Sequence, residues 1–271
     1  MVATPIGNLE DITLRAMRIL KEVDLIASED TRHTKKLLSH LDIRTPLFSY
    51  YREKEQEKAE LLVEKMLAGK NVALVSDAGT PGISDPGAVL VNAARQAGIP
   101  IVPVPGPAAL TAALSVSGLL GTAFAFYGFL PSSKGRRRKF LQSLVLQSGA
   151  LVFYESPKRI IGLLKDCLDI LGDRSLFVAR ELTKLHEETL IGDLSEIIDD
   201  LSRRTQIKGE FVVIITGADI KEKPQDEDFE KLLVWYKKSG SSLKDAVKTV
   251  TADLGLSRSA VYQKALKIWG K

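Results

Sequence analysis

The chain has 271 residues, a length that predicts two domains rather than one. With 45% hydrophobic and 27% charged residues it is typical of a globular protein, and a disordered or collagen-like chain is excluded. Its single cysteine, Cys167, cannot form an internal disulfide, which excludes a disulfide-stapled secreted scaffold and favours a reducing compartment. No basic region followed by an apolar core stands at the N-terminus, so we expect no secretory signal and a cytoplasmic location.

The charge is distributed unevenly along the chain. The net charge is +4, but the segment from Trp235 to the C-terminus alone carries eight Lys or Arg against two Asp, a net of +6. The remaining 234 residues therefore sum to −2. A mildly acidic body with a basic appendage favours a polyanionic partner, although a solvated helical face would give the same pattern.

Residues 96 to 133 carry no charge, which raises the question of a membrane span. Five glycines and five prolines interrupt this stretch, whereas a spanning helix needs about 20 unbroken apolar residues. We therefore expect buried strands and a buried helix here, and no membrane association.

Short apolar runs alternate with amphipathic stretches almost to the C-terminus. Continuous runs rich in Val, Ile and Leu predict buried strands, at Leu25–Ser28, Val72–Val75, Ile101–Val104, Leu151–Tyr154, Phe177–Arg180 and Phe211–Thr216. Apolar residues at three- and four-residue spacing predict helices, at Leu14–Val23, Lys54–Leu67, Ala88–Ala97, Phe140–Leu146 and Arg159–Leu171. This alternation predicts an α/β fold with mostly parallel sheets, in which ligands bind at the carboxyl ends of strands.

Two breaks in the pattern divide the chain. Glycines in Ser117–Thr122 and a polar segment with a proline at Lys221–Asp228 predict domains at residues 1–117, 118–220 and 229–271. The third of these domains shows helical patterns only. Within it Leu243–Trp269 predicts a helix, a stop at Gly255 and a second helix capped by Ser257, a helix-turn-helix pattern.

Three loops rich in glycine, proline and small residues follow predicted strands. They are Thr4–Leu9, the long loop Ser76–Gly87, and Val104–Ala109. Strand-to-helix turns need only two to six residues, so the length of the second loop favours a binding role. The sequence has no Gly-x-Gly-x-x-Gly, which leaves a nicotinamide dinucleotide unsupported.

Together with Ser28–Thr34 and Tyr154-Glu155-Ser156-Pro157-x-Arg159, these loops resemble the ribosomal RNA small subunit methyltransferase I family, a branch of the tetrapyrrole methylase-like superfamily. The resemblance spans nearly the whole chain and implies two α/β domains with S-adenosylmethionine in the cleft between them. It also implies a homodimer, whose interface residues 96–133 would partly supply. In that family several apolar residues precede Val-Ala-Thr-Pro, whereas here Met1 abuts Val2. Either the start codon is assigned late or the first strand is short, and a strand that starts here would span only ~10 Å.

The resemblance further implies the cofactor site. It would consist of Pro5, Gly7, Ser76, Asp77, Ala78, Gly79, Ile83, Ser84, Pro105, Gly106, Pro107, Ala108, Ala109, Tyr154, Glu181, Lys208, Gly209 and Glu210. The activity implied is 2′-O-methylation of a cytidine ribose in the decoding centre of 16S ribosomal RNA, with free RNA or the 30S subunit as substrate.

A general base would increase the rate of such a transfer by a factor of ~10² to 10⁴. The candidate catalytic carboxylates are Glu29, Asp30 and Glu155, and Asp85 also faces the predicted cleft. Arg32 and Arg159 lie near Asp30 and Glu155 and would weaken them as bases, and a structural ion pair is an equally good interpretation.

Basic residues cluster at helix starts, where a phosphate would offset their unfavourable interaction with the helix dipole. The candidate RNA-binding residues are Arg32, His33, Lys35, Lys36, Arg136, Arg137, Arg138, Arg159, Arg258 and Lys264. His33, His40 and His186 are scattered, so we expect no metal.

Two alternative functions stay open at this point. One is a porphyrinoid methylase of the same superfamily, for which the basic segments have no obvious use. The other is a catalytically silent DNA-binding regulator that uses the α/β body as a ligand sensor.

Overall fold

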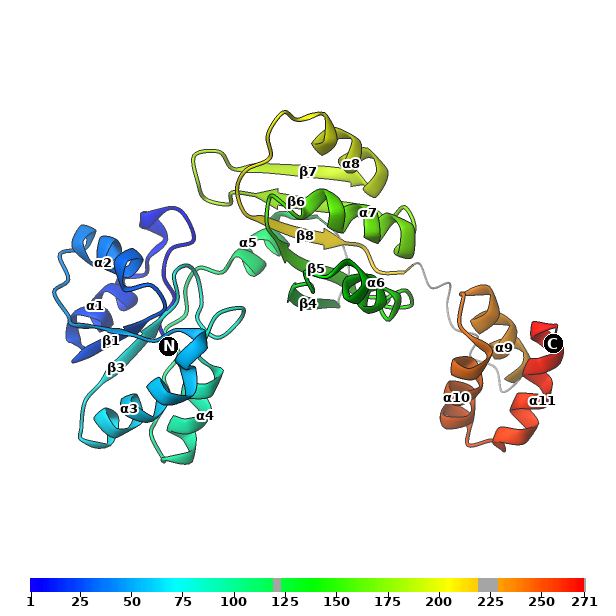
Figure 1. Ribbon diagram of the computed structural model, residues 1–271, viewed down its shortest axis with the longest axis horizontal. Coiled ribbons are helices and arrows are strands. Elements are labelled where there is room, and N and C mark those ends of the chain that lie inside the picture. Colours follow the sequence, from blue (N-terminus) through cyan, green and yellow to red (C-terminus); the bar gives the residue numbers. More distant parts are fainter. Residues whose placement is uncertain (119–122, 219–228, 271) are drawn as a thin grey trace. The chain divides into compact units, whose positions relative to one another are not determined.

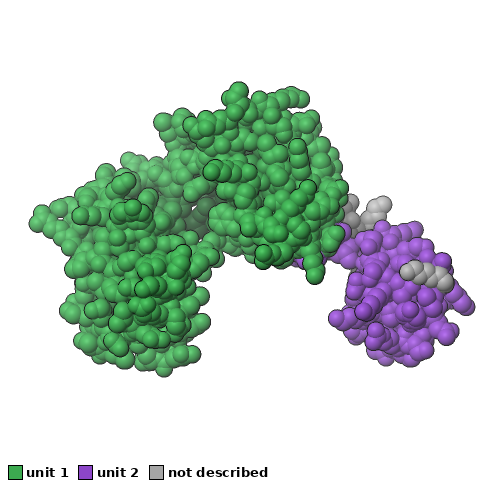
Figure 2. Space-filling model, in the orientation of Figure 1, with its two compact units in different colours: residues 1–142, 149–216 green, residues 143–148, 217–271 purple. Residues whose placement is uncertain are grey.

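The computed structural model describes residues 1–118, 123–218 and 229–270 (Figure 1). The chain divides into two compact units, coloured separately in Figure 2: residues 1–142 with 149–216, and residues 143–148 with 217–271. Unit 1 contains both sheets, and unit 2 contains three helices. The predicted breaks at 117–122 and 221–228 lie largely outside the described residues, so the three domain ranges remain predictions.

Unit 1 begins with a three-stranded sheet and its helices. The elements are η1 (Leu9–Asp11), α1 (Leu14–Glu22), β1 (Leu25–Ser28), α2 (Thr31–His40), β2 (Leu47–Ser49), η2 (Arg52–Lys54), α3 (Glu55–Leu67), β3 (Val72–Val75) and α4 (Ala88–Gln96). A five-stranded sheet follows, with α5 (Ala109–Val116), β4 (Phe124–Phe129), α6 (Lys134–Gln142), β5 (Ala150–Glu155), α7 (Ile160–Leu171), β6 (Ser175–Arg180), β7 (Glu188–Asp193), α8 (Leu194–Arg203) and β8 (Phe211–Ile215).

The first sheet is parallel, in the order β2-β1-β3, with Ile26 paired to both Leu47 and Ala73. The N-terminal residues extend it: the Val2 N–H donates to the Leu74 carbonyl at 2.9 Å, and the Val104 N–H donates to the Met1 carbonyl at 2.8 Å. The prediction of a full strand at Ile101–Val104 was wrong. Among the described residues of this segment only Val104 pairs, through a single bridge to Val2.

Helices cover both faces of this sheet. Leu20 of α1 and Leu38 of α2 pack with Ile26 on one face, and Leu62 of α3 and Leu90 of α4 pack with Leu74 on the other. Strands covered on both faces are continuous apolar runs, which is why β1 and β3 were predicted at their observed bounds.

The second sheet has the order β4-β5-β8-β6-β7 and is mixed. Only β4 and β5 pair in parallel, and the other three pairings are antiparallel, so the prediction of mostly parallel sheets was wrong here. A fully buried strand shows the same apolar run whichever way its neighbours point, so the sequence pattern could not distinguish them. Helix α5 packs on one face through Ala113, and α6, α7 and α8 lie along the other (Figure 1).

The uncharged stretch is less buried than expected. Val102, Val116, Phe124 and Phe129 are each more than half exposed, and of α5 only Ala113 is buried. The predicted helix at Phe140–Leu146 is also displaced: the helix there is α6, which contains the basic run and ends at Gln142. No helix among the described residues is long and apolar enough to cross a membrane.

Unit 2 comprises α9 (Phe229–Lys238), α10 (Leu243–Leu254) and α11 (Arg258–Trp269). Leu233, Val247, Val250 and Val261 from the three helices form its core. Gly255 ends α10 with a φ of 63°, the left-handed conformation that favours glycine, and Ser257 precedes α11 as predicted.

Candidate functional site

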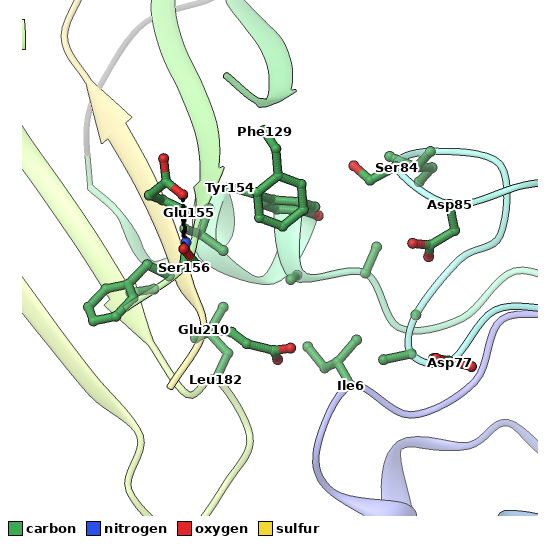
Figure 3. Close-up of a pocket in the computed structure, with 18 of the residues that line it drawn as sticks. Ile6, Asp77, Ser84, Asp85, Phe129, Tyr154, Glu155, Ser156, Leu182 and Glu210 are labelled. Atoms are coloured by element: carbon green, nitrogen blue, oxygen red, sulfur yellow. Dashed lines mark hydrogen bonds between the residues drawn. The ribbon is translucent and has the colours of Figure 1, made fainter. Parts of the chain in front are cut away.

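Unit 1 contains a cavity of about 440 Å³, the size of a small-molecule site (Figure 3). One side of the cavity is lined by loops that adjoin the first sheet. The other side is lined by the ends of β5, β6 and β8. The lining residues are Ile6, Asp77, Ala78, Gly79, Thr80, Ile83, Ser84, Asp85, Ala108, Ala109, Phe129, Tyr154, Glu155, Ser156, Pro157, Ala179, Leu182, Lys184, Glu210, Phe211 and Val212.

Backbone hydrogen bonds join the three loops singled out in the sequence. Thr4 and Gly79 exchange two backbone hydrogen bonds of 2.9 Å each. The Thr80 hydroxyl donates to the Pro107 carbonyl at 3.0 Å, which ties the second loop to the third. The loops therefore support one another around a common wall of the cavity.

Gly79 shows why this wall needs a glycine. Its φ is +78°, and a Cβ there would lie 3.2 Å from Cγ2 of Ile6. Both the backbone conformation and the close approach of the N-terminal loop therefore disfavour a side chain at this position.

Tyr154 links the second sheet to the start of α5. Its hydroxyl accepts a hydrogen bond of 3.0 Å from the Leu110 N–H, one of the amides that a helix start leaves without an internal partner. The rings of Phe126 and Phe129 meet the Tyr154 ring edge-on, with centroids 4.8 and 5.8 Å away. An aromatic wall thus stands beside the positive end of the α5 dipole.

The loop at 181–187 closes the opposite end of the cavity. Lys184 donates from Nζ to Oε1 of Glu181 and to Oε2 of Glu210, both at 2.8 Å. Glu181 Oε1 also accepts from the Glu210 N–H at 3.0 Å. A Cβ on Gly209 would lie 2.3 Å from Cγ of Glu181, and one on Gly7 would lie 2.4 Å from Cγ of Lys184, so both glycines permit close packing of this loop.

Four carboxylates and a single ammonium group line the cavity, which favours a ligand that carries positive charge. Burial raises the pKa of Asp85, and the neighbouring charge of Asp77 raises it further, against the opposing effects of Ser76 and Arg52. Burial likewise raises the pKa of Glu29, with contributions from Asp85 and Asp77.

The three predicted catalytic carboxylates differ in placement. Glu155 is 1% exposed and lines the cavity; Oε1 accepts from the Ser156 N–H at 2.8 Å and lies 3.1 Å from Nε of Arg159, while Oε2 has no partner among the described residues. Asp30 caps α2, and its hydrogen bonds from Arg32 lower its pKa to about 2. Neither Asp30 nor Glu29 lines the cavity.

These features fit the cofactor that the resemblance implies. S-adenosylmethionine carries a sulfonium and an ammonium charge, which the carboxylates match, and two buried oxygens that line the cavity, Glu155 Oε2 and Ser84 Oγ, lack partners among the described residues. Apolar side chains of Ile6, Leu182 and Val212 offer surface for an adenine ring.

The predicted cofactor residues fall into two groups. Those that line the cavity are Asp77, Ala78, Gly79, Ile83, Ser84, Ala108, Ala109, Tyr154 and Glu210. The predicted residues that do not line it are Pro5, Gly7, Ser76, Pro105, Gly106, Pro107, Glu181, Lys208 and Gly209, which belong to the same loops or adjoin lining residues in sequence. Sequence reasoning missed Lys184, which stands in a loop without a motif, and Phe129, whose strand was not predicted.

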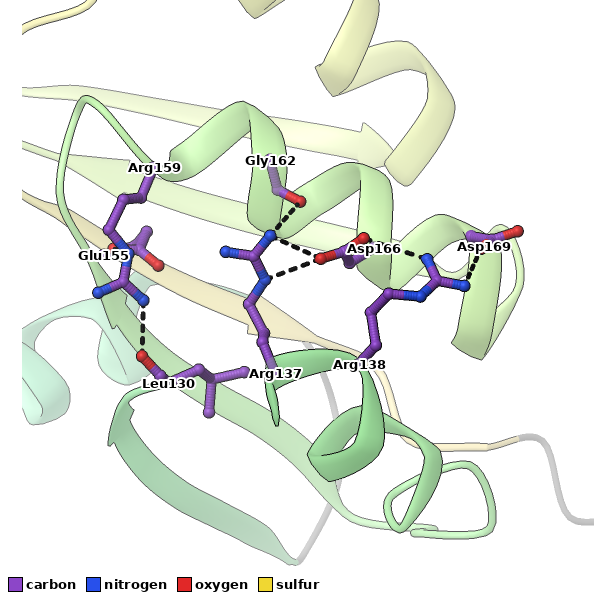
Figure 4. A network of polar contacts seen from close by, with 8 residues as sticks. All are labelled: Leu130, Arg137, Arg138, Glu155, Arg159, Gly162, Asp166 and Asp169. Carbon is purple, nitrogen blue, oxygen red and sulfur yellow. Dashed lines mark hydrogen bonds and ion pairs between the residues drawn. The ribbon is translucent and has the colours of Figure 1, made fainter. Parts of the chain in front are cut away.

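The basic run on α6 is largely tied to α7 (Figure 4). Arg137 is 7% exposed and donates to Asp166 Oδ2 from Nε at 2.8 Å and from Nη2 at 2.6 Å, and Arg138 pairs with Asp166 and Asp169. A buried guanidinium paired with a buried carboxylate cannot reach a phosphate, so Arg137 is corrected from an RNA contact to a structural residue. Arg136 is exposed.

The other candidate RNA-binding residues are distributed over both units. In α2, Arg32, His33, Lys35 and Lys36 are exposed. Arg159 is half-buried and donates from Nη2 to the Leu130 carbonyl at 2.6 Å. In unit 2, Arg258 is exposed and Lys264 pairs with Glu230.

Comparison with known proteins places these features in a family. Residues 1–198 match the model of the Tetrapyrrole (Corrin/Porphyrin) Methylases. Relatives named ribosomal RNA small subunit methyltransferase I include that of Halalkalibacterium halodurans, 45% identical over 97% of this chain and 92% of the relative. That of Synechocystis is 44% identical over 99% and 97%, and that of Escherichia coli O157:H7 is 42% identical over 100% and 95%.

Solved structures share the fold at lower identity. Diphthine synthase aligns with a TM-score of 0.61 and 14% identity, over 80% of this chain and 88% of that one. The uroporphyrin-III C-methyltransferase of Thermus thermophilus complexed with S-adenosyl homocysteine aligns with a TM-score of 0.56 and 22% identity, over 79% and 94%.

Proposed function

The chain belongs to the tetrapyrrole methylase family of S-adenosylmethionine-dependent methyltransferases, and we propose that it methylates the 2′-oxygen of a cytidine ribose in the decoding centre of 16S ribosomal RNA. The observation that carries this proposal is the name shared by relatives that are 41–50% identical. Its proposed substrate also places the activity in the cytoplasm.

The cavity residues have defined tasks in this proposal. The bound cofactor supplies an activated methyl group, so the main contribution of the protein is orientation of the two reactants. Asp77 would face a positive charge of the cofactor, the start of α5 would face its carboxylate, and Ile6 and Leu182 would hold its adenine.

Of the three predicted catalytic carboxylates, Glu155 has the strongest support, because it lines the cavity and keeps Oε2 unpartnered among the described residues. Its Oε1 lies 3.1 Å from Nε of Arg159, so the carboxylate is held in place and can orient a reactant. Asp30 is engaged as a helix cap, and Glu29 does not line the cavity.

The proposed partners are 16S ribosomal RNA or the 30S subunit, and a second copy of this chain. The exposed basic residues of α2 are accessible to phosphates, and so are Arg136 and Arg258. The exposed apolar side chains of Val116 and Phe124 within the uncharged stretch support the proposed homodimer.

The porphyrinoid alternative has weaker support, because the solved uroporphyrin-III methyltransferases are at most 22% identical and show the fold alone. A DNA-binding regulator has unit 2 in its favour, but it would leave the acidic cavity without a chemical task.

The test is incubation of the protein with methyl-labelled cofactor and either 30S subunits or uroporphyrinogen III. Transfer to a single cytidine ribose, mapped by nuclease digestion and mass spectrometry, is the expected result. Label on the macrocycle, on a base, or on neither substrate would contradict the proposal.

A further inference from the structure

A second hollow of about 470 Å³ adjoins the cofactor cavity. Its walls are Arg52 on η2, residues 83–85 of the long loop, and residues 126–129 of β4. Ile83, Ser84, Asp85 and Phe129 line both spaces, so the two share a wall.

A bulge in β4 presents an aromatic ring to this hollow. The β4–β5 register shifts between Phe126 and Phe129, and Gly128 at the shift has a φ of +60°. Bulges of this kind redirect a side chain beside an active site. Phe129 is 57% exposed, yet its ring is supported by Tyr154, which is itself held by the Leu110 N–H. The result is a braced aromatic side chain with free surface.

Polar groups stand opposite the ring. Arg52 is exposed, and Nη2 donates to the Ser84 carbonyl at 2.9 Å, which fixes the guanidinium while its other N–H groups make no ion pair or hydrogen bond with the described residues. Asp85 stands in the wall shared with the cofactor cavity and accepts hydrogen bonds when ionised.

Aromatic surface, a guanidinium and a hydroxyl acceptor are the three chemistries that hold one unstacked nucleotide. We propose that this second hollow receives the target nucleotide of the RNA, with its base on Phe129, its phosphate on Arg52 and its ribose hydroxyl on Asp85. This inference rests on the proposed function, because it places the acceptor ribose beside the cavity that would hold the methyl donor. A macrocycle, the alternative occupant, has no phosphate for Arg52.

The test measures affinity for deproteinised 16S ribosomal RNA and for 30S subunits by filter binding, and affinity for S-adenosylmethionine by calorimetry. Phe129→Ala should weaken RNA binding by about tenfold, within the range that removal of one base–aromatic stack produces, and Phe129→Trp should restore it. The control is Ile191→Ala, because Ile191 is 67% exposed on β7 of the same sheet and lines neither space.

Arg52→Gln provides an independent arm, since Arg52 lines only the second hollow. It should weaken RNA binding and reduce its salt dependence by about 0.7 log units, while cofactor affinity stays unchanged. Arg44→Gln, a change of an exposed arginine outside both spaces, should alter neither.

The outcomes separate the two proposals. If the unaltered protein methylates ribosomal RNA but Phe129→Ala and Arg52→Gln bind RNA as the controls do, the subsite is wrong and the proposed function stands. If Arg52→Gln loses cofactor affinity in step with RNA affinity, the two spaces are one site and the inference is overturned. If the unaltered protein neither binds nor methylates the RNA, the proposed function itself fails.

Discussion

Asp85 occupies a position that costs stability. Burial and the neighbouring Asp77 disfavour its ionised form, so its pKa in the folded protein lies above the unfolded value. A carboxylate at a position where burial disfavours its ionised form is typical of a binding or catalytic site.

Asp85→Asn is therefore expected to stabilise the protein at pH 7. With a raised folded-state pKa, the ionised carboxylate destabilises the folded state at neutral pH, and this effect disappears as the pH falls below about 4, where Asp85 is protonated in both states. The melting temperature should rise at pH 7, and the gain should shrink at pH 3.5. An equal gain at both pH values would show that charge is not the cause.

Gly79→Ala is expected to weaken cofactor binding beyond its effect on folding. The positive φ makes any side chain cost about 1 kcal/mol of stability, and the new methyl group would press on Ile6 at the cavity wall. Calorimetry with S-adenosylmethionine and thermal melting should be measured together.

Gly69→Ala is the matched control for this change. Gly69 has a φ of +88°, and a Cβ there would meet no described atom within 4 Å, so the substitution brings the same backbone strain away from the cavity. If both variants bind the cofactor equally, Gly79 does not shape the site.

At the scale of elements, the basic run on α6 combines two roles that its sequence does not distinguish. Arg136 and Arg137 are adjacent, but a helix turns successive side chains by about 100°, so one faces solvent and the other faces Asp166 of α7 (Figure 4). The charge pattern alone was compatible with either orientation.

Arg137→Met and Arg136→Met should consequently differ. Removing the Arg137 guanidinium leaves Asp166 buried with less compensation, and a decrease of about 3 kcal/mol in the free energy of unfolding is expected. Arg136→Met should leave stability unchanged and weaken RNA binding. Denaturant unfolding and filter binding check the pair, and equal stabilities would contradict the assigned role of Arg137.

The predictability of the elements follows from their environments. Runs buried on both faces, such as β1 and β3, were predicted at their observed bounds because burial alone determines their composition. The edge strand β7, with alternating exposure, and the partly exposed β4 were missed. The loops at strand ends were predicted as a site from glycine and proline content, whereas Lys184 reaches the cavity only through tertiary packing.

At the scale of the whole molecule, two units carry separate cores and separate candidate tasks. The cavity lies entirely within unit 1, and the core of unit 2 is formed by α9, α10 and α11 alone. Of the basic residues of unit 2, Lys264 pairs with Glu230 and Lys237 donates to the Ile268 carbonyl. Exposed Lys238, Lys244, Lys248, Arg258 and Lys267 are left for an external anion.

Removal of residues 229–271 should therefore separate cofactor binding from RNA binding. Cofactor affinity should persist, because no cavity residue lies in the removed segment. Affinity for 30S subunits should fall, and the slope of its logarithm against that of salt concentration should flatten by about 0.7 to 0.9 for each phosphate that the shortened chain no longer neutralises. Equal slopes for intact and truncated protein would mean that unit 2 does not bind phosphates, and RNA binding would then rest on unit 1, through the exposed cations of α2 and Arg136.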